Sequence, residues 1–197
     1  IQDEENVLTG GFAKTSRKCP PFCVHSMQVA PGVTTVGELE LLDFIKQRVT
    51  PGTGLLIDAR APEWYAKGTI PGSVNIPFFL FQKDGSDPEM KVVLDQIGIK
   101  PRTAGVIERL WASIKRLFGM QVNENALNWD LTKAKHLLLW CNGPWCDQSP
   151  RAIHSLLKLG YPESKLSYYR GGMQDWLVLG LTVVVPGTEP AAPADKK

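Results

Sequence analysis

Residues 136–160 have the sequence HLLLWCNGPWCDQSPRAIHSLLKLG. The apolar run His136 to Trp140 predicts a short buried strand. Pro150 to Gly160 predicts a helix, because proline suits the first turn of a helix and glycine suits its end. The loop between them carries Cys141 and Cys146. A strand that passes through a short loop into a helix is the repeating unit of parallel α/β folds.

The same alternation extends along most of the chain. Thr35 to Arg48 has apolar residues at helical spacing, and Thr34 or Thr35 is the expected N-cap. Further short strands and helices are expected at 54–58, 62–67, 74–77, 166–169 and 174–179. We therefore expect one α/β domain over residues 33–185, with a three-layer arrangement in which helices flank a central parallel sheet. Chemistry is expected at the carboxyl ends of the strands, where Cys141 lies.

Residues 78–135 are expected to be a helical insertion between core elements. Within 103–119, the apolar residues share one face of a predicted helix: Val106, Ile107, Leu110, Trp111, Ile114, Leu117 and Phe118. We expect this helix to pack on the domain. The alternative is a basic amphipathic helix that lies on a membrane surface or on a protein partner.

The two ends of the chain are expected to lie outside the domain. The arm 1–32 contains Cys19-Pro20-Pro21-Phe22-Cys23, and its prolines exclude a helix there. A local disulfide or two free thiols is favoured over a zinc site with His25, and the spacing is not the C-x-x-C-H of haem attachment. A further hypothesis is that the arm folds over the site and brings its thiols to Cys141 as a relay. Residues 186–197 are expected to form a flexible tail.

Composition limits the classes of partner and the compartment. The net charge of +2 predicts no nucleic-acid partner. No apolar run approaches the roughly 18 residues that span a bilayer. The chain begins with Ile1, as a processed exported protein or a truncated sequence would, and its four cysteines form two local pairs. We expect a periplasmic or otherwise exported location in preference to the cytoplasm.

The loop that begins at Cys141 has the features of an anion-binding cradle. Its members after the cysteine are Asn142, Gly143, Pro144, Trp145, Cys146, Asp147, Gln148 and Ser149. Backbone N–H groups that converge before a helix N-terminus favour negative charge, so the thiolate of Cys141 is favoured there. Cys141 is therefore the expected nucleophile, without a catalytic histidine, and His136 and His154 are expected to be structural or on the surface.

Several motifs in the correct order resemble the rhodanese family. The first half of the resemblance comprises Asp58-Ala59-Arg60, Glu63-Trp64-Tyr65 and Gly68-Thr69-Ile70-Pro71-Gly72-Ser73-Val74-Asn75-Ile76-Pro77. The second half comprises the Cys141–Ser149 loop, Leu159-Gly160-Tyr161 and Tyr169-Arg170-Gly171-Gly172-Met173-Gln174-Asp175-Trp176. Together they extend from Val33 to Val185.

The resemblance implies a rhodanese-like sulfurtransferase. Its cysteine would accept a sulfane sulfur from a small donor such as thiosulfate, hold it as a persulfide and pass it to a thiol acceptor, with no cofactor and no metal. Asp58 and Arg60 would support the site structurally, with Arg60 paired to a nearby carboxylate. Gly171 and Gly172 would form a tight turn with positive φ, and Trp176 would pack in the core.

This sequence departs from the family pattern in three places. Cys141 lies eight residues before Ser149, so the loop is about two residues longer than is common in the family. Gln148 stands where a basic residue often binds an anionic donor, and Asp147 would oppose such a donor and raise a neighbouring thiol's pKa. Arg151 could supply the missing positive charge, but we expect it to be a solvated surface residue. Thr69 replaces the usual histidine, which we interpret as a structural substitution.

Two other functions remain open. Cys141 and Cys146 are spaced for a reversible disulfide, which would make the protein a thiol–disulfide redox protein. A non-catalytic binding module is the second alternative. A phosphatase is disfavoured because Asp147 occupies the position of the arginine in related phosphatase loops. Cys146 is disfavoured as the nucleophile because it lies too close to the start of the helix.

Overall fold

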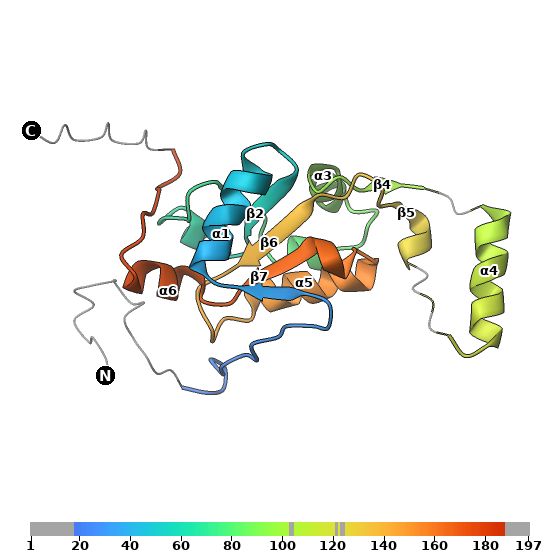
Figure 1. The fold of residues 1–197 in the computed structure, drawn as a ribbon, viewed down its shortest axis with the longest axis horizontal. Helices are drawn as coiled ribbons and strands as arrows, with labels where there is room; N and C mark the ends of the chain where they lie inside the picture. Colours follow the sequence, from blue (N-terminus) through green and yellow to red (C-terminus); the bar gives the residue numbers. More distant parts are fainter. Residues whose placement is uncertain (1–17, 103–104, 121, 123–124, 188–197) are drawn as a thin grey trace, which may run out of the picture.

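The computed structural model describes residues 18–102, 105–120, 122 and 125–187. Its centre is a five-stranded sheet with the order β1-β7-β6-β2-β3, in which every pair is parallel (Figure 1). The strands are β1 (Thr34–Val36), β2 (Gly54–Asp58), β3 (Ser73–Asn75), β6 (His136–Trp140) and β7 (Leu166–Tyr169). The expected parallel α/β architecture is confirmed, and the strand that leads to Cys141 is at the centre of the sheet.

Helices cover both faces of this sheet because successive strand residues point to opposite sides. Leu137 and Leu139 of β6 pack in one core cluster, which includes residues of α3 (Pro88–Gln96) and α5 (Gln148–Leu159). Leu138 and Trp140 pack in the other cluster, with residues of α1 (Glu38–Phe44) and α6 (Gly172–Val178). The three layers are therefore α3/α5, sheet and α1/α6.

The beginning of the domain differs from the expectation. Thr34 and Thr35 belong to the edge strand β1, so neither of them caps the first helix. Gly37 is the N-cap of α1, and its amide donates to the carboxylate of Glu40 at 3.0 Å. The helix continues as a turn of π-helix, η1 (Ile45–Val49). A run that includes β-branched Thr34, Thr35 and Val36 favours a strand, and this preference prevailed over the helical spacing.

The other short elements connect these layers. They are α2 (Pro62–Tyr65), the 3₁₀ helices η2 (Leu80–Gln82), η3 (Asn125–Asn128) and η4 (Glu163–Lys165), and the antiparallel pair β4 (Lys100–Pro101) and β5 (Trp129–Asp130). The helix expected at 103–119 is α4 (Val106–Leu117), and residues 103–104 lie outside the described residues. It stands apart from the sheet layers (Figure 1), so the expectation that it packs on the domain is wrong. The sequence shows which side of a helix is apolar, but not what covers that side.

The ends of the chain are described in part. Cys19 and Cys23 form a disulfide in the arm, in agreement with the local pairing. Residues 1–17 of the arm and 188–197 of the expected tail lie outside the described residues. Within the described part, no helix is long and apolar enough to cross a membrane.

Candidate active site

Cys141 follows β6 directly, at the carboxyl end of the central strand of the sheet. The loop turns through a hydrogen bond from the Cys146 amide to the Gly143 carbonyl oxygen at 2.9 Å. Asp147 is the N-cap of α5, and the helix ends at Gly160, whose φ of 99° suits only glycine. The strand, loop and helix predicted from the sequence are thus present, and the first turn of α5 lies beside Cys141.

The sulfur of Cys141 is buried among polar groups. Its side chain is free, and the residue is 2% exposed. The Ser149 hydroxyl donates to Cys141 Sγ at 3.0 Å, and the backbone amides of Gly143 and Ser149 also donate to it. In the thiol form, Sγ can donate to the Cys146 carbonyl oxygen at 3.4 Å. The surroundings therefore differ from an apolar pocket, in which a buried cysteine is inert.

Competing effects set the pKa of the Cys141 thiol. Burial raises it, because a low-dielectric interior disfavours the thiolate. Hydrogen bonds from the Cys146 side chain, from Ser149 and from the Gly143 amide favour the thiolate and outweigh burial, so the net pKa lies below its ordinary value. The arrangement favours the thiolate form of Cys141 beside the first turn of α5.

Cys146 has the opposite tendency. Its hydrogen bond to Cys141, together with burial and the charge of the Cys141 thiolate, raises the pKa of the Cys146 thiol. The Cys146 thiol also donates to the side-chain oxygen of Gln148 at 3.8 Å. The Ser149 hydroxyl and the amides of Gly143 and Ser149 converge on the Cys141 sulfur, which favours Cys141 over Cys146 as the candidate nucleophile.

The start of α6 packs against the Cys141 loop and forms two backbone hydrogen bonds with it. The Met173 amide donates to the Cys141 carbonyl oxygen at 2.9 Å, and the Gln174 amide donates to the Asn142 carbonyl oxygen at 3.0 Å. Gly172 has a φ of 58°, and a Cβ atom there would lie 2.3 Å from the Cys141 carbonyl oxygen. Gly171 has a φ of −57°, so the expectation of positive φ holds for Gly172 and is wrong for Gly171. Only a residue without a side chain allows α6 to approach the loop this closely.

Asp58 and Arg60 form a buried network next to the site-bearing strand. Arg60 donates from Nε and Nη2 to the two carboxylate oxygens of Asp58, at 2.8 and 2.6 Å. Arg60 also donates to the Gly68 carbonyl oxygen at 2.6 Å, and its guanidinium lies 4.7 Å from the centre of a Trp140 ring. The Thr69 hydroxyl donates to Asp58 at 2.9 Å. Asp58 is thus the carboxylate partner of Arg60, and Thr69 serves this network structurally.

The charged residues at the start of α5 face outward. The Asp147 side chain is 57% exposed and lies 3.7 Å from Arg151, which partly offsets its charge. The thiol pKa of Cys141 is lowered, contrary to the rise that the nearby carboxylate suggested, because hydrogen bonds from the loop act directly on the sulfur. Arg151 lies against the ring of Phe78 and donates to Gln82 at 3.1 Å. Gln148 is half-buried and lies near the Cys146 sulfur, 3.8 Å from it.

The arm lies against the middle of the loop. The His25 amide donates to the Pro144 carbonyl oxygen at 2.8 Å, and the ring of Phe22 meets the ring of Trp145 edge-on, with 5.6 Å between centroids. Arg170 donates twice to the His25 carbonyl oxygen, at 3.0 and 2.7 Å. The arm therefore covers the Pro144–Trp145 side of the loop. No sulfur–sulfur contact joins the arm to Cys141 within the described residues, so the relay remains a hypothesis.

Two further polar side chains, those of Asn142 and Tyr168, lie near the sulfur, and Tyr168 was not among the site residues expected from the sequence. Tyr168 of β7 lies beside Ser149, and burial together with the charge at Cys141 raises the pKa of its phenol. The Tyr168 hydroxyl and the Asn142 amide oxygen are buried, and in the described part of the chain neither completes a hydrogen bond. Asn142 was expected in the loop, whereas Tyr168 comes from the neighbouring strand. Both can offer hydrogen bonds to a bound molecule.

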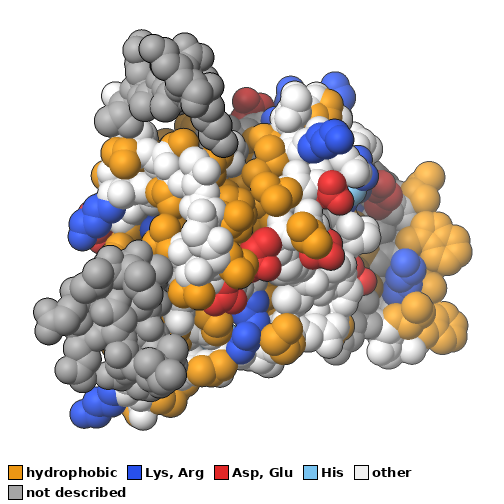
Figure 2. All heavy atoms as spheres, turned by 60° about the vertical axis from the view of Figure 1, so that its left-hand side comes forward, with side chains coloured by type: hydrophobic (Ala, Val, Ile, Leu, Met, Phe, Trp, Pro, Cys, Tyr) orange, Lys and Arg blue, Asp and Glu red, His pale blue; other side chains and the backbone are white. Residues whose placement is uncertain are grey.

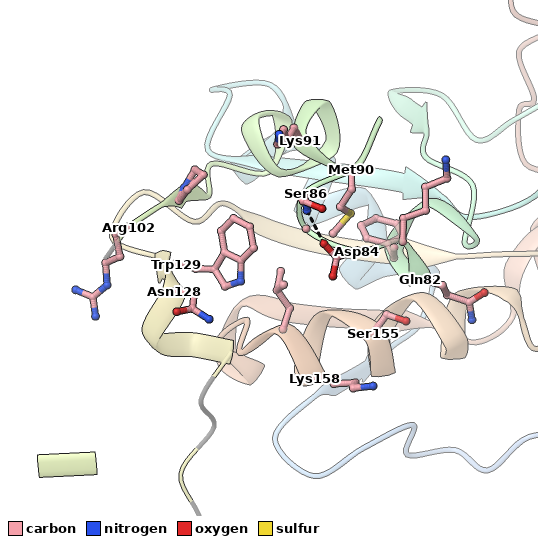
Figure 3. A pocket seen from close by; sticks show the side chains of 15 residues that line it. Gln82, Asp84, Ser86, Met90, Lys91, Arg102, Asn128, Trp129, Ser155 and Lys158 are labelled. Carbon is pink, nitrogen blue, oxygen red and sulfur yellow. Dashed lines mark hydrogen bonds between the residues drawn. The ribbon is translucent and has the colours of Figure 1, made fainter. Parts of the chain in front are cut away.

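Other features lie away from the sulfur. A cavity of about 1010 Å³ is found beside the last turns of α5, where Trp129, Met90 and Ser155 help to line it (Figure 3). None of its lining residues belongs to the Cys141 loop.

His136 begins β6, at the opposite end of the strand from Cys141, and burial lowers its pKa. His154 meets the Val29 carbonyl oxygen at 3.1 Å. No metal-binding cluster of His, Cys, Asp or Glu occurs among residues 18–102, 105–120, 122 and 125–187.

Comparison with protein families identifies the chain. The family model of the rhodanese-like domain matches residues 40–178, most of the described fold and the whole Cys141 loop. The protein belongs to the rhodanese-like domain family. Its family relationship agrees with the motifs that resembled rhodanese in the sequence. No match is found among curated proteins.

Solved structures similar to this rhodanese-like chain include proteins described as sulfurtransferases. A thiosulfate sulfurtransferase from Pseudomonas aeruginosa is 16% identical, with a TM-score of 0.46 over 79% of this chain and 21% of the other. A human single-domain sulfurtransferase is 20% identical, with a TM-score of 0.35 over 76% of this chain and 97% of the other. A rhodanese-like domain from Anabaena is 16% identical, with a TM-score of 0.40 over 85% and 91% of the two chains.

Proposed function

We propose that this protein is a sulfurtransferase that carries sulfane sulfur as a persulfide on Cys141. The observation that supports this most directly is the free Cys141 sulfur, which receives hydrogen bonds from Ser149 and two backbone amides at the start of α5. A lowered thiol pKa supplies the thiolate that such chemistry requires. The match of the rhodanese-like domain model to residues 40–178, which include the whole loop, also supports the proposal.

The proposed transfer has two displacement steps. The Cys141 thiolate attacks the sulfane sulfur of a donor, a bond forms between the two sulfurs, and the remainder of the donor leaves with the electron pair. With thiosulfate, the leaving group is sulfite and the product is the Cys141 persulfide anion. A thiolate acceptor then attacks the outer sulfur and takes it, and Cys141 leaves as a thiolate. The amides of Gly143 and Ser149 are positioned to stabilise negative charge at Cys141 in both steps.

The charges around the loop favour a donor of low charge, such as a hydropersulfide or a short polysulfide, over dianionic thiosulfate. Asp147 and Gln148 lie at the N-terminus of α5. Arg151 lies 3.7 Å from Asp147, contacts the Phe78 ring and donates a hydrogen bond to Gln82. A dianion would meet the exposed carboxylate of Asp147, and the nearby cation Arg151 is already engaged by Asp147, Gln82 and the Phe78 ring. The buried side-chain oxygens of Asn142 and Tyr168 are uncharged, so they suit hydrogen bonds to a bound sulfur compound more than ion pairs with it.

A redox function remains the second candidate, because Cys146 forms a hydrogen bond to Cys141. If Cys146 attacked the inner sulfur of the persulfide, a Cys141–Cys146 disulfide would form and hydrosulfide would leave. A dithiol reductant would then have to restore both thiols. The raised pKa of Cys146 opposes this step, since a thiol is a poor nucleophile.

Donor and acceptor kinetics distinguish these functions. The reduced protein is mixed with thiosulfate or with a glutathione hydropersulfide, and the sulfane sulfur delivered to a thiol acceptor is measured. We expect transfer from the hydropersulfide to exceed transfer from thiosulfate, and to disappear in Cys141→Ser but persist in Cys146→Ser. Loss of transfer in both variants, with a Cys141–Cys146 disulfide in the wild type, would support the redox function instead.

A further inference from the structure

Helix α4 extends from the body of the molecule and, among the described residues, contacts little of the rest of the chain. In Figure 1 it lies at the end farthest from α6, outside the layers of the sheet domain. Its one buried hydrophobic residue among those described is Ala112, at 5% exposure. Arg109, Ala112, Ser113 and Arg116 line a small cavity of about 250 Å³ together with Leu127 and Asn128 of η3. The side of α4 that faces its own chain is therefore mostly polar.

The other side of α4 is apolar and exposed to solvent. Successive helical residues are about 100° apart, which places the large apolar side chains together, opposite the side that faces η3. Their exposed fractions are 59–85%: Ile107, Leu110, Trp111, Leu117 and Phe118. A helix that packs on its own domain would instead turn its apolar side toward the domain and its polar side toward solvent. The orientation of α4 thus leaves its apolar side for something outside the described chain.

The charges of α4 are mainly basic. Lys115 and Arg116 lie in the last turn, and no acidic residue occurs from Arg109 to Met120. Glu108, the acidic residue of the helix, lies 3.4 Å from Arg102, which offsets its charge. Figure 2 shows a group of hydrophobic side chains with basic colour among them at the right-hand edge of the molecule, the side on which α4 lies in Figure 1. Lys115 lies beside the exposed apolar strip that includes Trp111, and this combination is complementary to an anionic surface with an apolar interior.

We propose that α4 binds the surface of an anionic lipid bilayer, with its apolar side between the headgroups and the acyl chains and Lys115, at the edge of that side, among the headgroups. A helix of 12 residues is about 18 Å long and about 10 Å wide, so its apolar strip is much smaller than the roughly 800 Å² per partner of a stable protein interface. A bilayer needs no matching protein surface, and a single amphipathic helix binds it reversibly. The helix would hold the domain beside the membrane.

Vesicle sedimentation with the full chain tests this proposal. Vesicles of phosphatidylcholine alone are compared with vesicles of equal parts phosphatidylglycerol and phosphatidylcholine. We expect binding to the anionic vesicles, weaker binding at high salt, and little binding to the neutral ones. Leu117→Gln and Phe118→Gln should each weaken binding about tenfold, the loss expected when one large apolar side chain is no longer buried. The matched control is Leu39→Gln, a substitution of an exposed leucine on α1, which should not change binding.

Three results would overturn the proposal. They are equal binding to neutral and anionic vesicles, no binding to either, and loss of binding in the Leu39→Gln control equal to that in Leu117→Gln. A dimer in sedimentation equilibrium that Leu117→Gln dissociates, without vesicle binding, would assign the apolar side to a second copy of the chain. Circular dichroism and thiol titration of each variant confirm that the fold is intact, and neither depends on sulfur transfer.

Discussion

Ser149 Oγ lies 3.0 Å from Cys141 Sγ, where the first turn of α5 meets the end of β6. Ser149 is completely buried, so bulk solvent does not reach its hydroxyl. A hydrogen bond to a charged group contributes about 1.5–3 kcal/mol, more than one between neutral groups. This contact is therefore a principal reason why a buried cysteine can ionise.

Removal of the hydroxyl should raise the pKa of the Cys141 thiol. In Ser149→Ala the backbone amides remain but the side-chain donor is lost, so the rate of persulfide formation near neutral pH should fall by about tenfold or more. The matched control is Ser155→Ala on the same helix, away from the sulfur, which should leave the rate unchanged. The thiolate absorbance of Cys141, followed against pH in a Cys146→Ser background, gives the pKa directly. An unchanged pKa in Ser149→Ala would show that the hydroxyl does not stabilise the thiolate.

The pH dependence of Cys141 reactivity follows from the direction of its pKa shift. Because the folded protein lowers the thiol pKa, the thiolate persists below the value of about 8.5 that is typical of free cysteine. Alkylation of Cys141 by iodoacetamide should reach its plateau at a lower pH than alkylation of the same residue in urea. Cys146, whose pKa is raised, should react only after unfolding. If Cys146 were alkylated first in the folded protein, the assignment of the two cysteines would be reversed.

Gly172→Ala should disrupt the loop. The new Cβ would lie 2.3 Å from the Cys141 carbonyl oxygen and 2.7 Å from the Gly143 amide nitrogen, in a backbone conformation with φ of 58°. We expect a loss of about 1–3 kcal/mol in the free energy of unfolding, measured with urea, and much slower persulfide formation. Gly180→Ala is the control: its φ is 71°, and nothing lies within 4 Å of its Cβ position. Equal losses in both variants would attribute the effect to backbone conformation and not to crowding of the loop.

The arm is expected to slow access to Cys141. In Phe22→Ala the edge-on contact with Trp145 is lost, and such a contact contributes about 0.5–1.5 kcal/mol. Alkylation of Cys141 by a bulky maleimide should therefore become about two- to tenfold faster. Val24→Ala is the control on the same arm, because Val24 is 72% exposed. If neither substitution changes the rate, the arm does not limit access to the sulfur.

The fold around Cys141 could be predicted because local signals agree there. The apolar run 136–140, the proline near the start of α5 and Gly160 after its end all have local physical causes. The edge strand β1 was missed because it has only three residues, Thr34–Val36. Two of them also fit the helical spacing that continues to Arg48, so they were assigned to the helix. The placement of α4 was predicted wrongly because an amphipathic pattern is the same whether the apolar side meets the domain or an external surface.

The charges and hydrogen bonds around Cys141 could not be predicted from the sequence, because they depend on contacts that form only in the folded chain. Asp147 was visible in the sequence, but not that its carboxylate points to solvent and pairs with Arg151. Tyr168 reaches the site because β7 pairs with β6 and places it opposite Leu139. Such pairs are far apart in the sequence, so the loop alone could suggest Cys141 as a candidate nucleophile but could not predict the side chains around it.

The central claim is that the Cys141 thiolate accepts a sulfane sulfur, and the mass of the intact protein tests it most directly. The reduced protein is treated with polysulfide, desalted and measured without reductant, alongside Cys141→Ser and Cys146→Ser. The account predicts a gain of one sulfur atom in the wild type and in Cys146→Ser, and no gain in Cys141→Ser. A wild-type protein that gains no sulfur, or a Cys141→Ser variant that gains as much as the wild type, would contradict it.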